Sequence, residues 1–304
     1  MIRHLGYACQ NLTLGPKVLS NRTVRLKNVT RSKISELSLL NARDLLSIIK
    51  WNVENDIYFF RIGSGIFPFM DHYEVGYSFD DILPAQRNEI KEILKQVGEL
   101  AKKEKIRLSC HPGPYTCLAS PVETTLERSI MHIKMHDLLA DLMDLGPEFA
   151  INIHVGGSYD SKQETAKRFV EAYNTFSDNL KQRLTLENDD KASMWSISDL
   201  YHNIHLKCKI KLVLDIHHHK FCQSESLLDA AKMAFDTWSE FSEIPKVHYS
   251  ESRIGSRPQA HSDWIVGPIP SLGDMPYDVM LETKMKEKAL LGFRNSSVLS
   301  SSSV

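Results

Sequence analysis

Residues 150–155 read Ala-Ile-Asn-Ile-His-Val, and their alternation indicates which kind of parallel sheet the chain forms. Successive side chains of a β-strand point to opposite faces, so the two isoleucines share one face while Asn152 and His154 share the other. A central strand of an open parallel sheet is apolar on both faces. The strand ends of a closed (β/α)8 barrel instead point polar groups into a shared mouth, where barrel active sites lie. This stretch therefore favours a barrel.

The same alternation extends to the rest of the chain, where apolar runs alternate with helical stretches. The predicted strands are Ile2–Tyr7, Ile57–Gly63, Arg107–His111, Ala150–Val155, Leu184–Asn188, Lys211–Ile216, Lys246–Ser250 and Val279–Glu282. Their last residues on the polar face are Tyr7, Arg61, His111, His154, Glu187, Asp215, His248 and Glu282. Polar endings on all eight strands predict an α/β protein, a single-domain (β/α)8 TIM-type barrel over residues 1–290.

Helical periodicity fills the segments between the strands. The predicted helices are Leu83–Lys105, Ser120 to about Leu145, Ser161–Lys181, Ser196–Lys207 and Glu225–Phe241. A capping box, Ser-Pro-Val-Glu at 120–123, is expected to open the second of them. The Ser-rich end, residues 291–304, is of low complexity and is predicted to be disordered.

Composition indicates an ordinary globular protein. The chain has 304 residues, 42% of them hydrophobic, no apolar stretch long enough to span a membrane, and no signal-peptide core at its N-terminus. The five cysteines are scattered without metal-binding or disulfide-type spacing, which fits a reducing compartment. A cytoplasmic protein without a membrane partner is therefore expected.

The charge balance gives no clear indication of a nucleic-acid partner. The net charge is −1, although a carboxylate-rich metal site would lower the count. Basic residues gather at Arg22, Arg25, Lys27, Arg31 and Lys33. This cluster is either a solvated loop or a contact with DNA, and the sequence leaves both readings open.

Six of the eight strand ends are imidazoles or carboxylates. His218 follows Asp215 by three positions, and His261 lies with Asp263 in the loop after the seventh strand. Any one of these residues would more often be an ordinary hydrogen-bonded side chain, but six at equivalent places point to metal binding. Their number exceeds the needs of one ion and predicts a cluster of about two or three divalent ions, with Glu187 bridging. Such a cluster activates a hydroxide and clamps a phosphodiester.

Lys246 precedes His248 by two residues and so faces the same mouth. A lysine beside cations would be deprotonated, carbamylated into a metal ligand, or turned toward a substrate phosphate. A lysine paired with one of the carboxylates is the alternative, and the sequence does not separate these readings.

Across residues 2–290 the chain resembles the UV damage endonucleases. The matching segments are Arg3-His-Leu-Gly-Tyr7 with Asn11, Arg61-Ile-Gly-Ser64, His111-Pro-Gly, His154-Val-Gly-Gly157, Leu184-Thr-Leu-Glu-Asn-Asp189, Asp215-Ile-His-His-His219, Lys246-Val-His248, His261-Ser-Asp263 and Met280-Leu-Glu-Thr-Lys284. Each is weak alone, but their common order is specific. The resemblance implies a barrel related to endonuclease IV with a manganese-dependent cluster, zinc, magnesium or cobalt being alternatives.

The resemblance also implies an activity and a set of site residues. The activity is nicking of damaged double-stranded DNA immediately 5′ to pyrimidine dimers and 6-4 photoproducts, which leaves a 3′-hydroxyl and a 5′-phosphate. The implied metal ligands are His111, His154, Glu187, Asp215, His218, His248, His261 and Glu282. Catalytic roles fall to Glu187, Lys246 and Tyr7, and Lys246 matches a modified lysine of the family. Tyr7, Asn11, Arg61, Pro114 and Tyr115 are the expected DNA- or lesion-binding residues.

One loop departs from the family pattern. The family sequence His-Pro-Gly-Gln-Tyr is replaced by His111-Pro-Gly-Pro-Tyr115. Pro114 has no side-chain amide for hydrogen bonding, so lesion probing is expected to be steric, with Tyr115 as a wedge beside a flipped-out lesion. The damage spectrum is thus the property most affected.

Three other functions compete with this one. A general abasic-site endonuclease would share the metal cluster, and only substrate tests separate the two. A metal-dependent sugar isomerase would need fewer ligands, and a non-enzymatic binder of damaged DNA would need none. A monomer with no protein partner is expected in each case.

Overall fold

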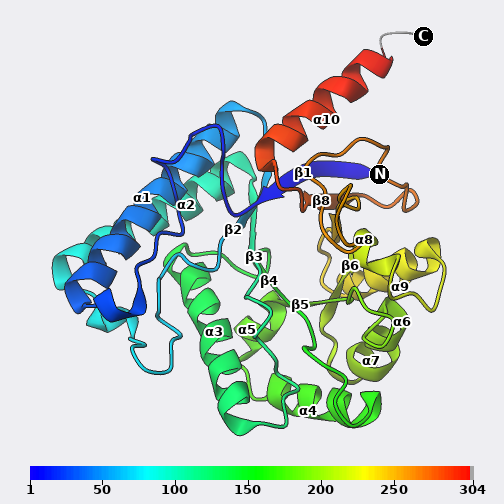
Figure 1. The fold of residues 1–304 in the computed structure, drawn as a ribbon, viewed down its shortest axis with the longest axis horizontal. Helices are drawn as coiled ribbons and strands as arrows, with labels where there is room; N and C mark the ends of the chain where they lie inside the picture. The colour runs from blue at the N-terminus through cyan, green and yellow to red at the C-terminus, as the bar shows by residue number, and fades with distance from the viewer. Residues whose placement is uncertain (302–304) are drawn as a thin grey trace.

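The computed structural model describes residues 1–301, with side chains described through residue 296. Its strands are β1 (Ile2–Ala8), β2 (Phe59–Ile62), β3 (Arg107–Cys110), β4 (Ala150–Ile153), β5 (Leu184–Glu187), β6 (Lys211–Asp215), β7 (Lys246–Tyr249) and β8 (Tyr277–Leu281). They form a closed barrel in sequence order, and β8 pairs in parallel with β1. The predicted (β/α)8 barrel is confirmed, and helices surround the strands (Figure 1).

The helices cover the outside of the barrel or cap its connections. They are α1 (Arg31–Glu54), α2 (Pro84–Glu104), α3 (Glu123–Leu142), α4 (Lys162–Asn174), α5 (Asp178–Arg183), α6 (Ile197–Leu200), α7 (Leu206–Cys208), α8 (Ile216–His219), α9 (Leu227–Ser239) and α10 (Lys286–Ser301). Short 3-10 helices span Leu26–Asn28 and Phe79–Asp81, and a π-helix spans Tyr201–His205. None of the described helices is long and apolar enough to cross a membrane.

All eight predicted strands are present, with bounds within two residues of those predicted. Most strands end slightly earlier than predicted, so that His111, His154 and Glu282 each follow the last residue of their strand. These side chains therefore stand on the rim, above the hydrogen-bonded ladder.

The barrel interior is narrow where β1, β2 and β8 meet. Ala8, Phe59 and Met280 form a small buried cluster there, separate from the large core between strands and helices. A Cβ on Gly6 would lie 2.5 Å from the Phe59 carbonyl oxygen, so only glycine fits against β2 at this point.

Helix α1 was not among the predicted helices. Thr30 caps it by accepting a hydrogen bond from the Lys33 amide at 3.1 Å, so Arg31 and Lys33 lie in its first turn. Arg22 forms an ion pair with Asp44 at 2.5 Å. The basic cluster is therefore partly helical and partly engaged within the protein, rather than a uniform loop.

Two predictions about the helices were wrong. The capping box at Ser120 does not form, because the hydroxyl of Ser120 accepts from the Val122 amide at 3.1 Å and α3 begins only at Glu123. The predicted helix Ser161–Lys181 is interrupted after Asn174, and Ser177 caps a separate helix α5 by accepting from the Leu180 amide at 3.3 Å.

The predicted boundary at residue 290 falls inside α10. Arg294 donates to the carbonyl oxygens of Asn55 and Asp56 at 3.2 and 2.7 Å, which ties this helix to the end of α1. The expected disordered tail therefore does not begin at residue 291, and its last part, residues 302–304, lies outside the described residues.

Candidate metal centre

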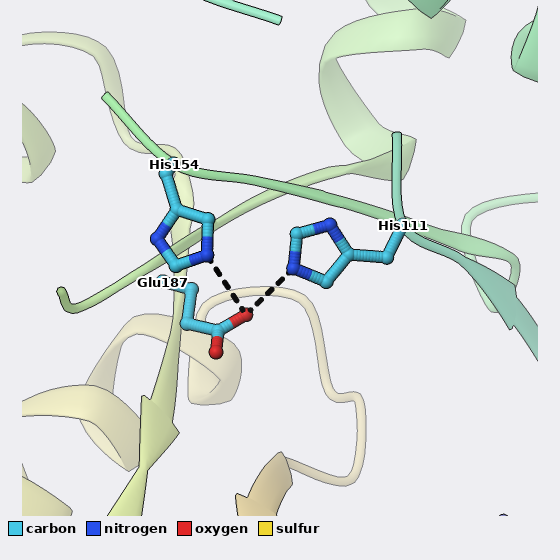
Figure 2. Close-up of side chains that lie close together, drawn as sticks. All are labelled: His111, His154 and Glu187. Carbon is cyan, nitrogen blue, oxygen red and sulfur yellow. Dashed lines mark ion pairs between the residues drawn. The ribbon is translucent and has the colours of Figure 1, made fainter. Parts of the chain in front are cut away.

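Glu187 stands at the centre of the barrel mouth. It is the last residue of β5, and its side chain is 1% exposed. Its Oε2 lies 3.2 Å from Nε2 of His111 and 3.8 Å from Nε2 of His154, and the two rings converge on this oxygen (Figure 2). These three residues form one group that could hold a metal ion.

A second group of possible ligands shares Glu187. It adds Asp215, His248 and Glu282, and its ligand atoms lie within 4.8 Å of one another. His248 Nδ1 is 3.1 Å from Glu187 Oε2 and 3.0 Å from Glu282 Oε1. Glu187 belongs to both groups, so its carboxylate could serve a metal ion in either of them.

His218 and His261 complete the ring of predicted ligands from outside these two groups. His218, in α8, places Nδ1 3.5 Å from Glu187 Oε1 and Nε2 3.9 Å from Asp215 Oδ2. His261, in the loop after β7, places Nε2 3.6 Å from Glu282 Oε2. All eight ligands predicted from the sequence therefore gather at one site.

Backbone carbonyl groups orient two of the imidazoles. His111 Nδ1 lies 3.0 Å from the Pro112 oxygen, and His218 Nδ1 lies 2.9 Å from the Asn188 oxygen. A ligating histidine commonly donates its other ring N–H in this way, which fixes the tautomer and aims the free nitrogen at the metal. In His111 the free nitrogen is the one that faces Glu187.

Several buried polar atoms in the mouth have no hydrogen-bond partner among the described residues. They include Asp215 Oδ2, both ring nitrogens of His248, Nδ1 of His154 and of His261, Nε of Arg61 and Nζ of Lys246. His248 lies close to two carboxylates, but the angles are not those of hydrogen bonds. Native proteins rarely leave buried polar groups unpaired without a functional reason. Imidazole nitrogens and carboxylate oxygens without sulfur suit zinc, manganese or related divalent ions, so these residues fit a metal cluster.

The charge balance of the mouth supports the same reading. Burial alone would raise the pKa of Glu187, but His248 and His154 more than offset it and hold that pKa well below the usual range. Burial lowers the pKa of His111 to about 4. The pKa of His218 is raised to about 10, because Asp215 and Glu187 outweigh the effect of burial. Bound cations would replace the protons that balance these carboxylates here.

Glu282 is paired with a cation of the protein. Arg61, from the end of β2, donates to Glu282 and is 9% exposed. Burial tends to lower the pKa of Arg61, but Glu282 more than offsets this and raises it. The guanidinium of Arg61 thus faces the candidate metal centre. Arg61 was predicted to contact DNA, but one of its nitrogens already donates to Glu282.

Lys246 is 1% exposed and points into the barrel below His248. Burial is the main cause that lowers the pKa of Lys246 to about 7, and Arg107 acts in the same direction. Its Nζ has no partner among the described residues, so the alternative of a simple lysine–carboxylate pair is wrong.

The predicted orientation of Tyr7 was wrong. Its ring packs edge-on against Phe60 outside the strands, and it is fully buried. Its hydroxyl donates to Asn52 of α1 at 2.6 Å and accepts from Asn11 at 2.9 Å. A register irregularity between Ile2 and Leu5 reverses the expected alternation in β1. Neither Tyr7 nor Asn11, which is 2% exposed, therefore presents a surface to DNA.

Polar residues behind the ligands were missed by the sequence analysis. Asn152 donates to Glu187 Oε2 and accepts from the Thr185 hydroxyl at 2.8 Å. Asp189 Oδ1 lies 3.1 Å from His154 Nδ1. Asn152 shares its strand face with His154, and Asp189 follows Glu187 by two residues, so strand position could have indicated both.

The loop after β3 separates two hollows. One, of about 310 Å³, is lined by Pro114, His154 and His218 and so adjoins the metal centre. The other, of about 530 Å³, lies on the side of Tyr73 and Tyr115. Tyr115 is 89% exposed, as expected for a side chain that projects from the rim.

Comparisons with known proteins agree with this geometry. The family model described as "UV-endonuclease UvdE" matches residues 3–302. A UV-damage endonuclease from Schizosaccharomyces pombe is 35% identical over 94% of this chain and 49% of its own length. A UV DNA damage endonuclease from Clostridium perfringens is 32% identical over 96% of this chain and 70% of its own length. The chain thus spans about half the length of the fission-yeast relative.

Solved structures give the same result. The structure titled "Crystal Structure of SacUVDE" superimposes with a TM-score of 0.83 at 32% identity, covering 95% of each chain. Endonuclease IV from Thermus thermophilus shares the fold at a TM-score of 0.55 and 15% identity, covering 83% of this chain and 93% of its own. On the family match, the identity to these relatives and the barrel they share, this chain belongs to the UV-endonuclease UvdE family.

Proposed function

We propose that this protein is a metal-dependent DNA endonuclease that incises double-stranded DNA at UV photoproducts. The observation that carries the proposal is the pair of ligand groups that share Glu187 at the barrel mouth. The relatives named as UV damage endonucleases support the choice of substrate. The cut lies immediately 5′ to a pyrimidine dimer or a 6-4 photoproduct and leaves a 3′-hydroxyl and a 5′-phosphate.

The mouth would hold a cluster of about two or three divalent ions. The eight gathered ligands would bind them, with Glu187 as the bridge, and manganese is the resident metal we propose. Ions held there would supply a nucleophile at neutral pH and offset charge on the phosphodiester.

The residues around the cluster position these ligands. Asn152 and Asp189 orient Glu187 and His154, as outer partners of metal ligands commonly do. Arg61 holds Glu282 in place. Lys246 acts beside the cluster, either as a modified ligand or as a neutral group near the scissile phosphate.

The exposed loop after β3 would read the lesion. A damaged nucleotide must leave the stack to reach the mouth, and weakened pairing lowers the cost. Tyr115 would fill the space left in the duplex. Pro114, also exposed, contributes a fixed backbone angle rather than a hydrogen bond. The protein would act as a monomer.

The test uses four end-labelled duplexes of one sequence: undamaged, with a single pyrimidine dimer, with a single 6-4 photoproduct, and with a single abasic site. Each is incubated with the protein and Mn²⁺, and the cut is mapped. The proposal expects incision directly 5′ to both photoproducts and none in the undamaged duplex. Incision of the abasic duplex alone would identify a general abasic-site enzyme instead. Absence of incision in all four would contradict an endonuclease.

A further inference from the structure

The connection between β7 and β8 carries an apolar side chain that the rest of the described protein leaves uncovered. Ile254 is 97% exposed. Gly255, next to it, has a φ of +73°, and a Cβ there would meet no atom within 4 Å. A single exposed isoleucine is ordinary. Ile254 differs because it lies at a turn that makes few contacts with the rest of the described protein.

Residues 250–262, here called the β7 hairpin, are firmly built below that turn. Ser252 and His261 form an antiparallel bridge, and the Arg253 amide donates to the Ala260 oxygen at 2.8 Å. The carboxylate of Glu251 accepts from the amides of Val266 and Gly267 at 3.1 and 2.7 Å. The base of the hairpin is thus fixed while its tip is free.

The β7 hairpin is directly connected to the candidate metal centre. It begins two residues after His248, and His261 stands in its second arm. His217 of α8 lies with Nε2 3.3 Å from the Gln259 oxygen, which places the hairpin against the connection that carries His218. In Figure 1 it belongs to the orange connection between β7 and β8.

The β7 hairpin and the Tyr115 loop belong to opposite sides of the mouth. β3 and β7 are four strands apart in a closed ring of eight, the greatest separation the ring allows. The rings of His111 and His248, at the ends of these strands, are 6.1 Å apart across the centre. Two exposed apolar side chains, Tyr115 and Ile254, thus project from connections on either side of the metal centre.

Charge around the tip indicates the partner. Arg253 precedes Ile254, and Arg257 follows it by three residues. Arg253 is held by Asp263 at 3.2 Å, yet its side chain remains 47% exposed. An apolar tip between arginines has the chemistry of proteins that insert an aliphatic wedge between base steps and contact the adjacent phosphates.

We propose that the β7 hairpin is a second DNA-reading element, with Ile254 inserted between base pairs across the metal centre from Tyr115. Arg253 and Arg257 contact phosphates on either side of the opened step. This inference rests on the proposed function. Its consequence is that the duplex is held open from two sides of the scissile phosphate, so that the lesion step is unstacked before incision.

The test compares Ile254→Ser with Val266→Ser. Val266 is a matched control, since it is 86% exposed, apolar and outside the hairpin. Each is assayed on a fully paired duplex with one dimer and on the same duplex with mismatches beside the dimer. Ile254→Ser should slow incision of the paired duplex about tenfold, the effect of losing part of the unstacking energy of one step. Incision of the mismatched duplex should stay within about threefold of wild type, because that duplex is already open.

A binding assay gives a readout that does not depend on incision. A 2-aminopurine base placed next to the dimer brightens when it is unstacked, and Glu187→Gln protein binds this duplex without cutting it. Adding Ile254→Ser to that protein should abolish the brightening, whereas adding Val266→Ser should not. Arg253→Ala and Arg257→Ala should each weaken binding of all duplexes and reduce the salt slope by about one ion.

The possible failures are distinguishable. If wild type does not incise any damaged duplex, the proposed function fails. If wild type incises but Ile254→Ser matches it on the paired duplex, the inference about the hairpin is wrong and the proposed function stands. Equal losses on the paired and mismatched duplexes, with the brightening retained, would also overturn the wedge. Unchanged metal content and melting temperature in each variant serve as the folding control.

Discussion

Both ends of the barrel bury charged residues. The N-terminal end holds its buried charges in hydrogen-bonded ion pairs, whereas the mouth leaves several buried polar atoms without hydrogen bonds among the described residues. At the N-terminal end, buried Asp278 accepts from Arg3 at 2.8 Å and from Arg107 at 2.9 Å, and Lys211 donates to Glu243 at 2.8 Å. At the mouth, Asp215 Oδ2, Lys246 Nζ and both ring nitrogens of His248 have no hydrogen-bond partner among the described residues. A fully paired network has a structural role, whereas buried imidazole and carboxylate atoms without hydrogen bonds are the atoms that would bind metal ions. Mutations at the two ends should therefore fail in different ways.

The largest effect is expected at the mouth, from Glu187→Gln. Loss of the bridging carboxylate should reduce incision more than about a hundredfold, beyond the range seen for outer partners of metal ligands. Binding of damaged DNA should largely persist, because phosphate contacts elsewhere supply most of the affinity. Single-turnover incision and a gel-shift titration measure the two quantities. Incision within about tenfold of wild type would show that Glu187 is not a ligand.

Asp278→Asn tests the opposite end. Removal of this carboxylate leaves Arg107, 8% exposed, without its countercharge, and breaking a buried pair in this way costs about 3–5 kcal/mol of unfolding free energy. The metal content of the folded protein should not change. Urea unfolding measures the loss of stability, with Glu240→Gln as control. Glu240 pairs with Lys209 at the surface, so its replacement should lower the free energy of unfolding by less than about 1 kcal/mol. A loss of bound metal in Asp278→Asn would break the proposed separation of roles.

Tyr115→Ala tests the role of the exposed ring at the rim of the barrel. If the ring stacks in the opened duplex, its removal should slow lesion-directed incision by about one to two orders of magnitude, which corresponds to about 1–3 kcal/mol of stacking. Tyr115→Phe keeps the ring and should retain most of the activity. Incision rates on a dimer-containing duplex decide the matter. Equal losses in the two variants, or no loss in Tyr115→Ala, would exclude a stacking wedge.

The smallest effect concerns His136, a buried residue of α3. Burial, with His132 beside it, lowers the pKa of His136 from 6.5 to about 3. Between these values the unfolded chain binds a proton that the folded protein does not, so stability falls as pH decreases from about 6.5 toward 3. His136→Leu should flatten this dependence by up to about 1.4 kcal/mol per pH unit. Unfolding of wild type and variant at several pH values tests this, with exposed His202→Leu as control; parallel curves would contradict it.

The parity of the strands carried most of what the sequence could predict. On seven strands it placed the last polar residue correctly in the mouth. On β1 it failed for Tyr7, because a register irregularity reverses the alternation there, and the residue types of β1 do not indicate that irregularity. The ligands were predictable because imidazoles and carboxylates are informative residue types. The strand position of Asn152, on the same face as His154, was also predictable, but its contact with Glu187 was not, since a buried amide is as common in structure as in function. The β7 hairpin was not predicted as a DNA-binding element, because Ile254 and its neighbouring arginines form no periodic pattern. Their possible role follows only from their position across the mouth from Tyr115, which the sequence does not show.

The charged cluster Arg22–Lys33 shows a second limit. Composition alone could not separate a solvated loop from a helix start, because the cap depends on one local hydrogen bond, from the Lys33 amide to Thr30. The capping pattern at Ser120 failed for the converse reason. Its hydroxyl accepts from the Val122 amide, two residues on, and that local bond replaces the cap.

We propose that the mouth, where buried ligand-type atoms have no hydrogen-bond partners among the described residues, holds a metal cluster, unlike the paired end of the barrel. Metal content per chain, measured by native mass spectrometry and elemental analysis on protein purified without chelator, tests it most directly. We expect about two or three divalent ions per chain in wild type and in Asp278→Asn, and fewer in Glu187→Gln. One ion or none in wild type, with Mn²⁺ failing to restore incision, would contradict it.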